Sequence, residues 1–337
     1  MAIPSNYTDT QFGIQNNAER YSWAAYFLFG ILSSLIGDTL ILFASLQHAF
    51  RIKKFLVPII QHIALSDLGY VIFGGIPIAA SLLANSWPLG TSLCYVRVYT
   101  AYSIYLSGMS LIAVLTTSKF LILRYPLRAA SWSTTRAHQF CSLIWASLLT
   151  IPILFLAVDK DDVEFDYRIY TCRYRYSSEI WKTMIPITGV IFGFAPNAVI
   201  LVTTVPILKY LVHAWKSARR VKGSIPWQGA FTVAVTSVVY CCSSFLYVVH
   251  RIVNTFIDEH PPGLFQVQFY RICHFLLMIN VVANFFIYIS TIKSFRTFLL
   301  VKLRPIKHMP KSTSLRTSRN IEPSYSSGAN CNYNLND

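Results

Sequence analysis

Seven long apolar stretches constrain the fold of this chain more than any other feature. They cover about residues 23–47, 55–83, 94–122, 139–158, 184–208, 228–249 and 265–292, and they are almost free of Asp, Glu, Lys and Arg. Each reaches or exceeds the roughly 20 residues that a helix needs to cross the hydrocarbon core of a bilayer. Buried helices of a water-soluble protein are the alternative, but seven of them in succession would leave no polar face for water. The sequence therefore predicts an all-α membrane protein, a bundle of seven transmembrane helices.

Composition supports the same conclusion. Only 13% of the 337 residues are charged, and the mean hydropathy is +0.47. In a soluble domain of this length, roughly a quarter of all residues would be charged. The composition thus excludes most soluble folds.

The distribution of basic residues predicts the orientation of the bundle. The links after spans one, three and five, together with the C-terminal tail, hold 20 of the 29 Lys and Arg but only two of the 14 acids. The N-terminus and the other links hold seven basic and ten acidic residues. We therefore expect an extracellular N-terminus and a cytoplasmic C-terminus. Basic residues beside an anionic leaflet account for the net charge of +15 without a nucleic-acid partner.

The chain divides into three predicted parts: an extracellular segment over 1–22, a seven-helix domain over 23–303 and a disordered cytoplasmic tail over 304–337. The first 20 residues lack the pattern of a cleavable signal peptide, so we expect the first span to act as its own insertion signal. Asn6, followed by Tyr7 and Thr8, is a candidate glycosylation site on the extracellular side.

Two of the seven cysteines are predicted to form a disulfide bond. Cys94, at the outer start of span three, and Cys172, in the link between spans four and five, share the oxidising side of the membrane. Their bond would hold the loop 159–182 over the mouth of the bundle. Two unpaired thiols are the alternative.

Short motifs in the expected spans resemble the rhodopsin-like (class A) G-protein-coupled receptors over about residues 23–303. They are Gly37-Asp38, Leu65-Ser66-Asp67-Leu68, Trp87-Pro88-Leu89-Gly90 before Cys94, Trp145, Pro196, Asn284-Phe285-Phe286-Ile287-Tyr288, and Lys293-Ser294-Phe295-Arg296. Any one match is weak, but their order and spacing together are specific. The last motif implies an amphipathic eighth helix on the inner leaflet. The short residue patterns that begin at Gly37, Thr117 and Tyr125 also resemble those of divergent invertebrate orphan receptors.

The chain departs from this family at positions that the resemblance assigns to switching and G-protein coupling. Ser118-Lys119-Phe120 stands where the family has Asp-Arg-Tyr, and a lysine lacks the planar, multi-donor guanidinium. Cys242 stands in the aromatic position of Cys-Trp-x-Pro, and Phe285 replaces the proline between Asn284 and Tyr288. We expect altered coupling with raised basal activity, or loss of conventional coupling. The resemblance assigns insertion into the G protein to the loop that contains Pro126 and Leu127.

Two carboxyl groups, Asp38 and Asp67, lie inside the predicted membrane spans. An ionisable group at that depth is by default a functional hypothesis. The family's packing brings both acids near Asn280 and Asn284. Two close carboxylates do not readily both ionise, so the pair should share a proton or hold a cation. The resemblance favours a sodium ion at Asp67, and a neutral hydrogen-bonded cluster is the alternative.

The resemblance also indicates what the ligand is not. Ala101 replaces the aspartate that binds monoamines, and Met278 replaces the lysine that binds retinal. The expected pocket wall comprises Arg97, Ala101, Tyr102 and Tyr105 of span three, Phe245, Val249 and His250 of span six, and Arg271 and His274 of span seven. Two arginines beside aromatic rings suit a peptide or a small acidic or lipid ligand. Alternatively, both arginines pair with acids of the loop 159–166.

Taken together, the sequence predicts a plasma-membrane receptor that transduces binding of an extracellular ligand to heterotrimeric G proteins. Serines and threonines at 312–318 suggest phosphorylation and arrestin recruitment. No catalytic constellation is apparent, so we do not expect an enzyme, and no cofactor other than sodium is expected. A transporter or channel, or a decoy receptor of the same fold, remains the alternative.

Overall fold

The computed structural model of the chain describes residues 16–47, 53–158, 163–167, 169–174, 183, 187–218, 228–256 and 264–302. Its helical elements are α1 (Asn17–Leu46), α2 (Leu56–Tyr70), the π-helical turn η2 (Val71–Gly75), α3 (Ile76–Ala84), α4 (Gly90–Arg124), α5 (Pro126–Ala130), α6 (Thr134–Val158), the π-helical turn η3 (Val190–Phe194), α8 (Ala195–Ala218), α9 (Gln228–Phe256), α10 (Leu264–Thr291) and α11 (Lys293–Lys302). The strands are β1 (Val163–Asp166) and β2 (Thr171–Tyr174).

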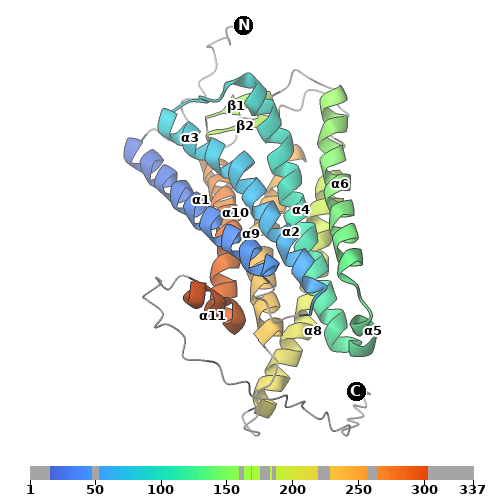
Figure 1. Cartoon of the computed structure of the whole chain (residues 1–337). Helices are drawn as coiled ribbons and strands as arrows, with labels where there is room; N and C mark the ends of the chain where they lie inside the picture. The colour runs from blue at the N-terminus through green and yellow to red at the C-terminus, as the bar shows by residue number, and fades with distance from the viewer. Residues whose placement is uncertain are drawn as a thin grey trace, which may run out of the picture.

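The long helices lie side by side in one bundle, as the sequence predicts (Figure 1). Among the described residues, six segments are long and apolar enough to cross a membrane: Asn17–Leu46, Leu56–Ala84, Gly90–Arg124, Ile187–Ala214, Ala230–Val249 and Arg271–Thr291. Helix α6, with 25 residues, completes the seven. Residues 139–158 of α6 include no Asp, Glu, Lys or Arg. The seven-helix fold is therefore confirmed.

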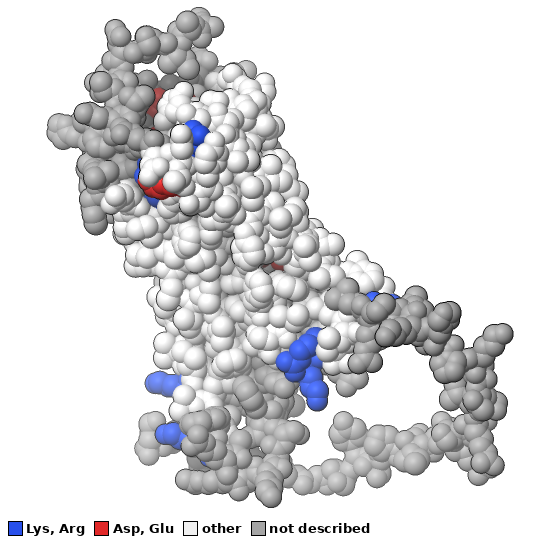
Figure 2. Space-filling model, turned by 90° about the vertical axis from the view of Figure 1, so that its left-hand side faces the viewer, with Lys and Arg blue, Asp and Glu red and all other residues white. Residues whose placement is uncertain are grey.

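The two ends of the bundle differ. The β1–β2 hairpin lies at one end, and the short helix α11 crosses the other end (Figure 1). We call these the outer and inner ends, in the orientation that the charge distribution predicts. Figure 2 shows a broad surface band almost without charged residues between charged ends, as contact with lipid tails requires. The expected amphipathic eighth helix is present as α11, which buries Phe295 and Leu299.

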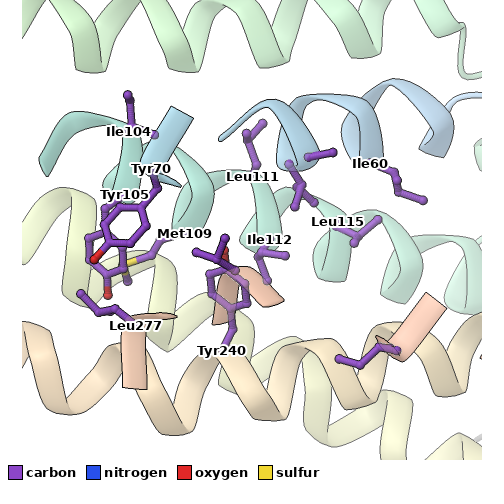
Figure 3. Packing of buried hydrophobic residues seen from close by; sticks show 14 of the residues in the cluster. Ile60, Tyr70, Ile104, Tyr105, Met109, Leu111, Ile112, Leu115, Tyr240 and Leu277 are labelled. Atoms are coloured by element: carbon purple, nitrogen blue, oxygen red, sulfur yellow. The ribbon is translucent and has the colours of Figure 1, made fainter. Parts of the chain in front are cut away.

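Helix α4 forms the centre of the bundle, where it contacts α2, α6, α8 and α9. Met109, Leu111, Ile112 and Leu115 of α4 are almost completely buried. Figure 3 shows these side chains packed with residues such as Tyr70 of α2 and Tyr240 of α9. A helix surrounded on all sides needs no polar face, which explains why apolar residues occupy most of its circumference.

Several helices extend beyond the apolar stretches. α1 begins six residues earlier than predicted, because the Asn16 side chain caps its first turn by accepting a hydrogen bond from the Ala18 N–H at 2.9 Å. α8 continues to Ala218, ten residues past the end predicted at 208. The basic residues Lys209 and Lys216, which follow the apolar stretch, therefore lie on the same helix.

Candidate functional site

The outer end of the bundle is covered by the hairpin, which is fastened to α4 in two ways. β1 and β2 pair antiparallel, with Phe165 opposite Cys172. Cys172 forms a disulfide bond with Cys94, and the two Cα atoms are 5.5 Å apart. The predicted pairing is confirmed. Arg97, one turn further along α4, donates from Nη1 to the Cys172 carbonyl oxygen at 2.6 Å. The Tyr170 hydroxyl in turn donates to Asn85 Oδ1 at 2.8 Å, so the hairpin is also held to the end of α3.

A cavity of about 30 Å³ lies beneath this lid, between α1, α3, the hairpin and α10. It is lined by Trp23, Phe27, Ile78, Leu82, Ile169, Tyr170, Arg271 and His274. That space holds one or two water molecules, whereas a drug-sized ligand needs several hundred Å³. The cavity is therefore large enough for only a small part of such a ligand. Six of its eight lining residues are aromatic or aliphatic, and Arg271 and His274 supply the polar groups.

The charge of Arg271 is compensated by a glutamate on α1. Arg271 Nη1 lies 3.5 Å from Glu19 Oε1, and the side chains of Arg271 and Glu19 are 12% and 47% exposed. Trp23 Nε1 donates to the same Glu19 oxygen at 3.4 Å. Desolvation of a guanidinium costs free energy unless an anion lies beside it. Glu19 thus places a carboxylate at the rim of the cavity, held by a cation and an indole N–H.

Some of the residues predicted for the pocket meet behind this cavity. Tyr247 of α9 contacts both Tyr105 and His274, with ring centroids 5.2 and 5.4 Å apart. Ala101 is buried, while Tyr102 and Val249 are half-buried. Arg97 instead supports the hairpin backbone. Arg271 forms an ion pair with Glu19, and Asp166 of the loop 159–166 also acts electrostatically on its guanidinium. Residues 159–162 of that loop and the side chain of His250 lie outside the described parts.

Two residues of α9 that were predicted to face the interior of the bundle instead face outward. Phe245 is 40% exposed and lies beside Phe194, with ring centroids 6.3 Å apart. Cys242 is likewise exposed. The positions two residues further along, Ser244 and Tyr247, are buried. A shift of two residues turns a side chain by about 200° around a helix. The sequence analysis placed Cys242 at the position of the family's aromatic switch residue, and this assignment is wrong by two residues. Ser244, rather than Cys242, is buried at this depth of α9.

A buried polar cluster joins α1, α2, α9 and α10 in the middle of the bundle. Asn284 Nδ2 donates to Asp67 Oδ2 at 2.6 Å, and the Tyr240 hydroxyl lies 3.5 Å from Asp67 Oδ1. Asp38 Oδ2 accepts from the Ser34 hydroxyl at 2.5 Å. Asn280 Oδ1 accepts from the Ser243 hydroxyl. The two acids are 0% and 2% exposed, and Asp38 Oδ1 and Asn284 Oδ1 have no hydrogen-bond partner among the described residues.

The inner end contains the residues predicted for switching. Ser118 is buried, and Lys119 and Phe120 are half-buried at the inner turns of α4. Among the residues that the structure describes, the one ion pair recorded lies at the outer end and does not involve Lys119. Pro126 opens the short helix α5, and Leu127 beside it is 89% exposed. Tyr288 of α10 is 2% exposed.

Comparison with known proteins identifies the family. The profile of the 7 transmembrane receptor (rhodopsin family) matches residues 37–288, three quarters of the chain. The chain belongs to this family. This rhodopsin-family protein is 28% identical to proteinase-activated receptor 1 of Xenopus laevis over 135 residues, which cover 39% of this chain and 31% of that receptor. It is 20% identical to the human uracil nucleotide/cysteinyl leukotriene receptor over 248 residues, 72% of this chain and 65% of the relative. It is 24% identical to somatostatin receptor type 5 of Rattus norvegicus over 172 residues, 49% and 46% of the two chains. The chain thus spans between about a third and two thirds of the length of these relatives.

Three features of this rhodopsin-family protein escaped sequence reasoning. Glu19 and Arg271 are 252 residues apart, and no local signal connects them. Tyr240 lies one helical turn before Ser244, so its approach to Asp67 required the correct rotation of α9. The hairpin strands have four residues each, which is too short for an alternating pattern to stand out. The position of the acid Glu19 just before the aromatic residues at 21–27 could have drawn attention to Glu19, but nothing in the sequence identified Arg271 as its partner.

Proposed function

We propose that this protein is a plasma-membrane receptor that passes the binding of an extracellular ligand to heterotrimeric G proteins. Membership of the rhodopsin family supports this role, and the relatives named above are all receptors. The inner end offers the exposed residues Pro126 and Leu127 of the short helix α5 for the G protein. Arrestin would join at the phosphorylated tail, which lies outside the described residues, as does the glycosylation site at Asn6.

We further propose that the ligand carries an acidic group on an apolar body. The observation that supports this class most directly is the Glu19 carboxylate, which occupies Arg271 Nη1 and Trp23 Nε1 at the rim of an apolar cavity. A ligand carboxylate or phosphate can replace the Glu19 carboxylate at the same donors, while its apolar part displaces water from the cavity. A relative named for uracil nucleotides and cysteinyl leukotrienes is named for two classes of anionic molecule, which agrees with this proposal.

The experiment pairs each acidic probe with its neutral derivative. Long-chain fatty acids and peptides with free C-termini are compared with the methyl esters and amides, and nucleotide exchange is measured on a panel of G proteins in membranes that contain the receptor. We expect Arg271→Gln to weaken the acids about 10- to 100-fold, because a hydrogen bond to a charged group contributes roughly 1.5–3 kcal/mol. Glu19→Gln should strengthen them, since it removes the competing carboxylate.

The control is Arg97→Gln, which loosens the hairpin and should weaken acidic and neutral probes alike. Equal potency of acids and neutral derivatives on the unchanged receptor would contradict the ligand class. Absence of exchange on every G protein, persisting in Lys119→Arg, would instead favour a decoy receptor. A solute flux across liposomes would favour a transporter.

We also infer that the buried polar cluster holds a sodium ion. Hard cations prefer oxygen ligands, and Asp38 Oδ1 and Asn284 Oδ1 are oxygens without a hydrogen-bond donor among the described residues. Asp38, Asp67 and Asn284 would hold the ion, whose charge would compensate the carboxylates. Asn280 is a weaker candidate, because its Oδ1 already accepts from Ser243.

A further inference from the structure

The inner part of α8 carries a surface hollow that the receptor function does not use. The hollow has a volume of about 410 Å³ and is lined by Val205, Leu208, Lys209, Val212, His213 and Lys216. All six residues lie on one helix, at spacings of one, three or four. They therefore form a single stripe along α8.

This stripe faces away from the bundle. Thr204, Ile207 and Ala214 of the same helix are buried, and with about 100° per residue they lie on the opposite side of α8. By contrast, Val205 and Val212 of the stripe are 51% and 53% exposed. In a membrane-spanning helix, the face that turns away from the protein contacts lipid.

The order of residue types along the stripe follows the profile of a membrane leaflet. Val205 and Leu208 come first, and the three residues Lys209, His213 and Lys216, with Val212 among them, follow toward the inner end. The stripe extends over about 16 Å, at 1.5 Å per residue. It thus begins beside lipid tails and ends at the level of the headgroups. Long lysine side chains can place their stems on apolar surface and their ammonium groups among headgroups.

The protein supplies little negative charge to neutralise this stripe. Between residues 180 and 257 the sequence contains no Asp or Glu, and the inner links and tail together hold only two acids. Arg219, Arg220 and Lys222 continue the basic run just beyond the described part of α8. Clusters of four to eight basic residues beside a transmembrane helix attract anionic inner-leaflet lipids.

We propose that this stripe of α8 binds an anionic phospholipid of the inner leaflet, with a phosphorylated inositol headgroup in the hollow. The phosphate oxygens accept hydrogen bonds from Lys209 and Lys216, and from His213 where its ring nitrogen carries a proton. One acyl chain lies along Val205 and Leu208. The lipid is a second, intracellular ligand, independent of the acid at the outer cavity, and it stabilises α8 at the height where the G protein docks.

The test measures lipid binding directly and needs no signalling. Dioctanoyl phosphatidylinositol 4,5-bisphosphate is titrated into the full-length receptor in detergent, and bound lipid is counted by native mass spectrometry. The Lys209→Gln/Lys216→Gln double variant should bind about 30-fold more weakly, since each basic residue near the headgroup contributes roughly a factor of five. Both side chains are exposed, so the variant should unfold at the same temperature as the unchanged protein.

The matched control is Lys53→Gln/Lys54→Gln, which removes the same charge from exposed positions elsewhere at the inner end. It should leave binding within about threefold, because neither lysine lines the hollow. Dioctanoyl phosphatidylcholine should not bind, and inositol 1,4,5-trisphosphate, which lacks acyl chains, should compete only weakly. If the two double variants lost equal lipid affinity, diffuse charge attraction would explain the binding and the proposed site would be wrong. Equally tight binding of the trisphosphate would overturn the lipid in favour of a soluble phosphate.

Discussion

At the scale of single residues, Asp67 is the group on which the proposed sodium site most depends. Asn284 donates to one of its oxygens, and Tyr240 approaches the other. If sodium binds there, the ion stabilises the folded receptor by about 1.4 kcal/mol at tenfold excess over its Kd. We expect sodium chloride to raise the unfolding temperature of the purified receptor by a few degrees relative to choline chloride, and Asp67→Asn to abolish this difference.

Tyr240→Phe serves as the control for this measurement. It removes the hydroxyl beside Asp67 Oδ1 but leaves the two oxygens without donors, Asp38 Oδ1 and Asn284 Oδ1, unchanged. Sodium should still stabilise this variant. A receptor whose unfolding temperature is the same in sodium and choline would show that the acids form a neutral hydrogen-bonded cluster.

At the scale of elements, the contact between α1 and α10 depends on Gly37. A Cβ atom added at Gly37 would lie 2.6 Å from both Cβ and Cγ of Phe285, the residue that replaces the family's proline. Those atoms are close to the α10 backbone and have little freedom to move. We expect Gly37→Ala to destabilise the receptor by about 1–3 kcal/mol through overpacking, read as a lower unfolding temperature.

Gly30 provides a matched comparison on the same helix. A Cβ there would lie 2.6 Å from Cε and 2.8 Å from Cγ of Met278, but this unbranched side chain can change its rotamer more readily than a phenylalanine ring. Gly30→Ala should therefore cost less than Gly37→Ala. Combining Gly37→Ala with Phe285→Ala should recover part of the loss. If both glycine variants unfolded alike, the close approach at Gly37 would not be limiting.

The same scale explains how much of the molecule is readable from the sequence. Apolar length alone located the seven spans, because a bilayer requires about 20 residues of each helix. The rotation of α9 was not accessible, since the chain lacks the tryptophan and proline that would have anchored its register, and Phe245 was misplaced as a result. The two π-helical turns, η2 and η3, insert extra residues without any local signal that we recognised.

The candidate site divides in the same manner. The pairing of Cys94 with Cys172 followed from their shared compartment, and the contact of Asp67 with Asn284 followed from the resemblance to the family. The Glu19–Arg271 pair depends on how α1 packs against α10, which no pattern within either helix records. Contacts between helices distant in the sequence are thus the part that required the structure.

At the scale of the whole molecule, the Cys94–Cys172 bond closes a loop across 78 residues of sequence. Replacing both cysteines by serine should lower stability by about 2 kcal/mol, the low end of the usual range, because the inserted helices already restrict the unfolded chain. Unfolding in detergent, followed by intrinsic fluorescence, measures the loss. A reductant should lower the stability of the unchanged receptor to that of the double-serine variant.

Cys242→Ser is the corresponding control, since Cys242 is exposed and forms no disulfide bond. Its unfolding temperature should match that of the unchanged receptor and should fall equally on reduction. A reductant that left the unchanged receptor unaffected would show that the hairpin holds its place without the covalent bond.

The ion pair between Glu19 and Arg271 affects which anionic molecules can bind at the cavity. Because Glu19 belongs to the same chain, its carboxylate competes at an effective concentration on the order of millimolar. A small free anion such as acetate, with no further contacts, cannot win that competition at concentrations below this effective concentration. On the proposed ligand class, only a molecule that adds apolar contacts to its charge would bind, and Glu19 of α1 would select against simple acids.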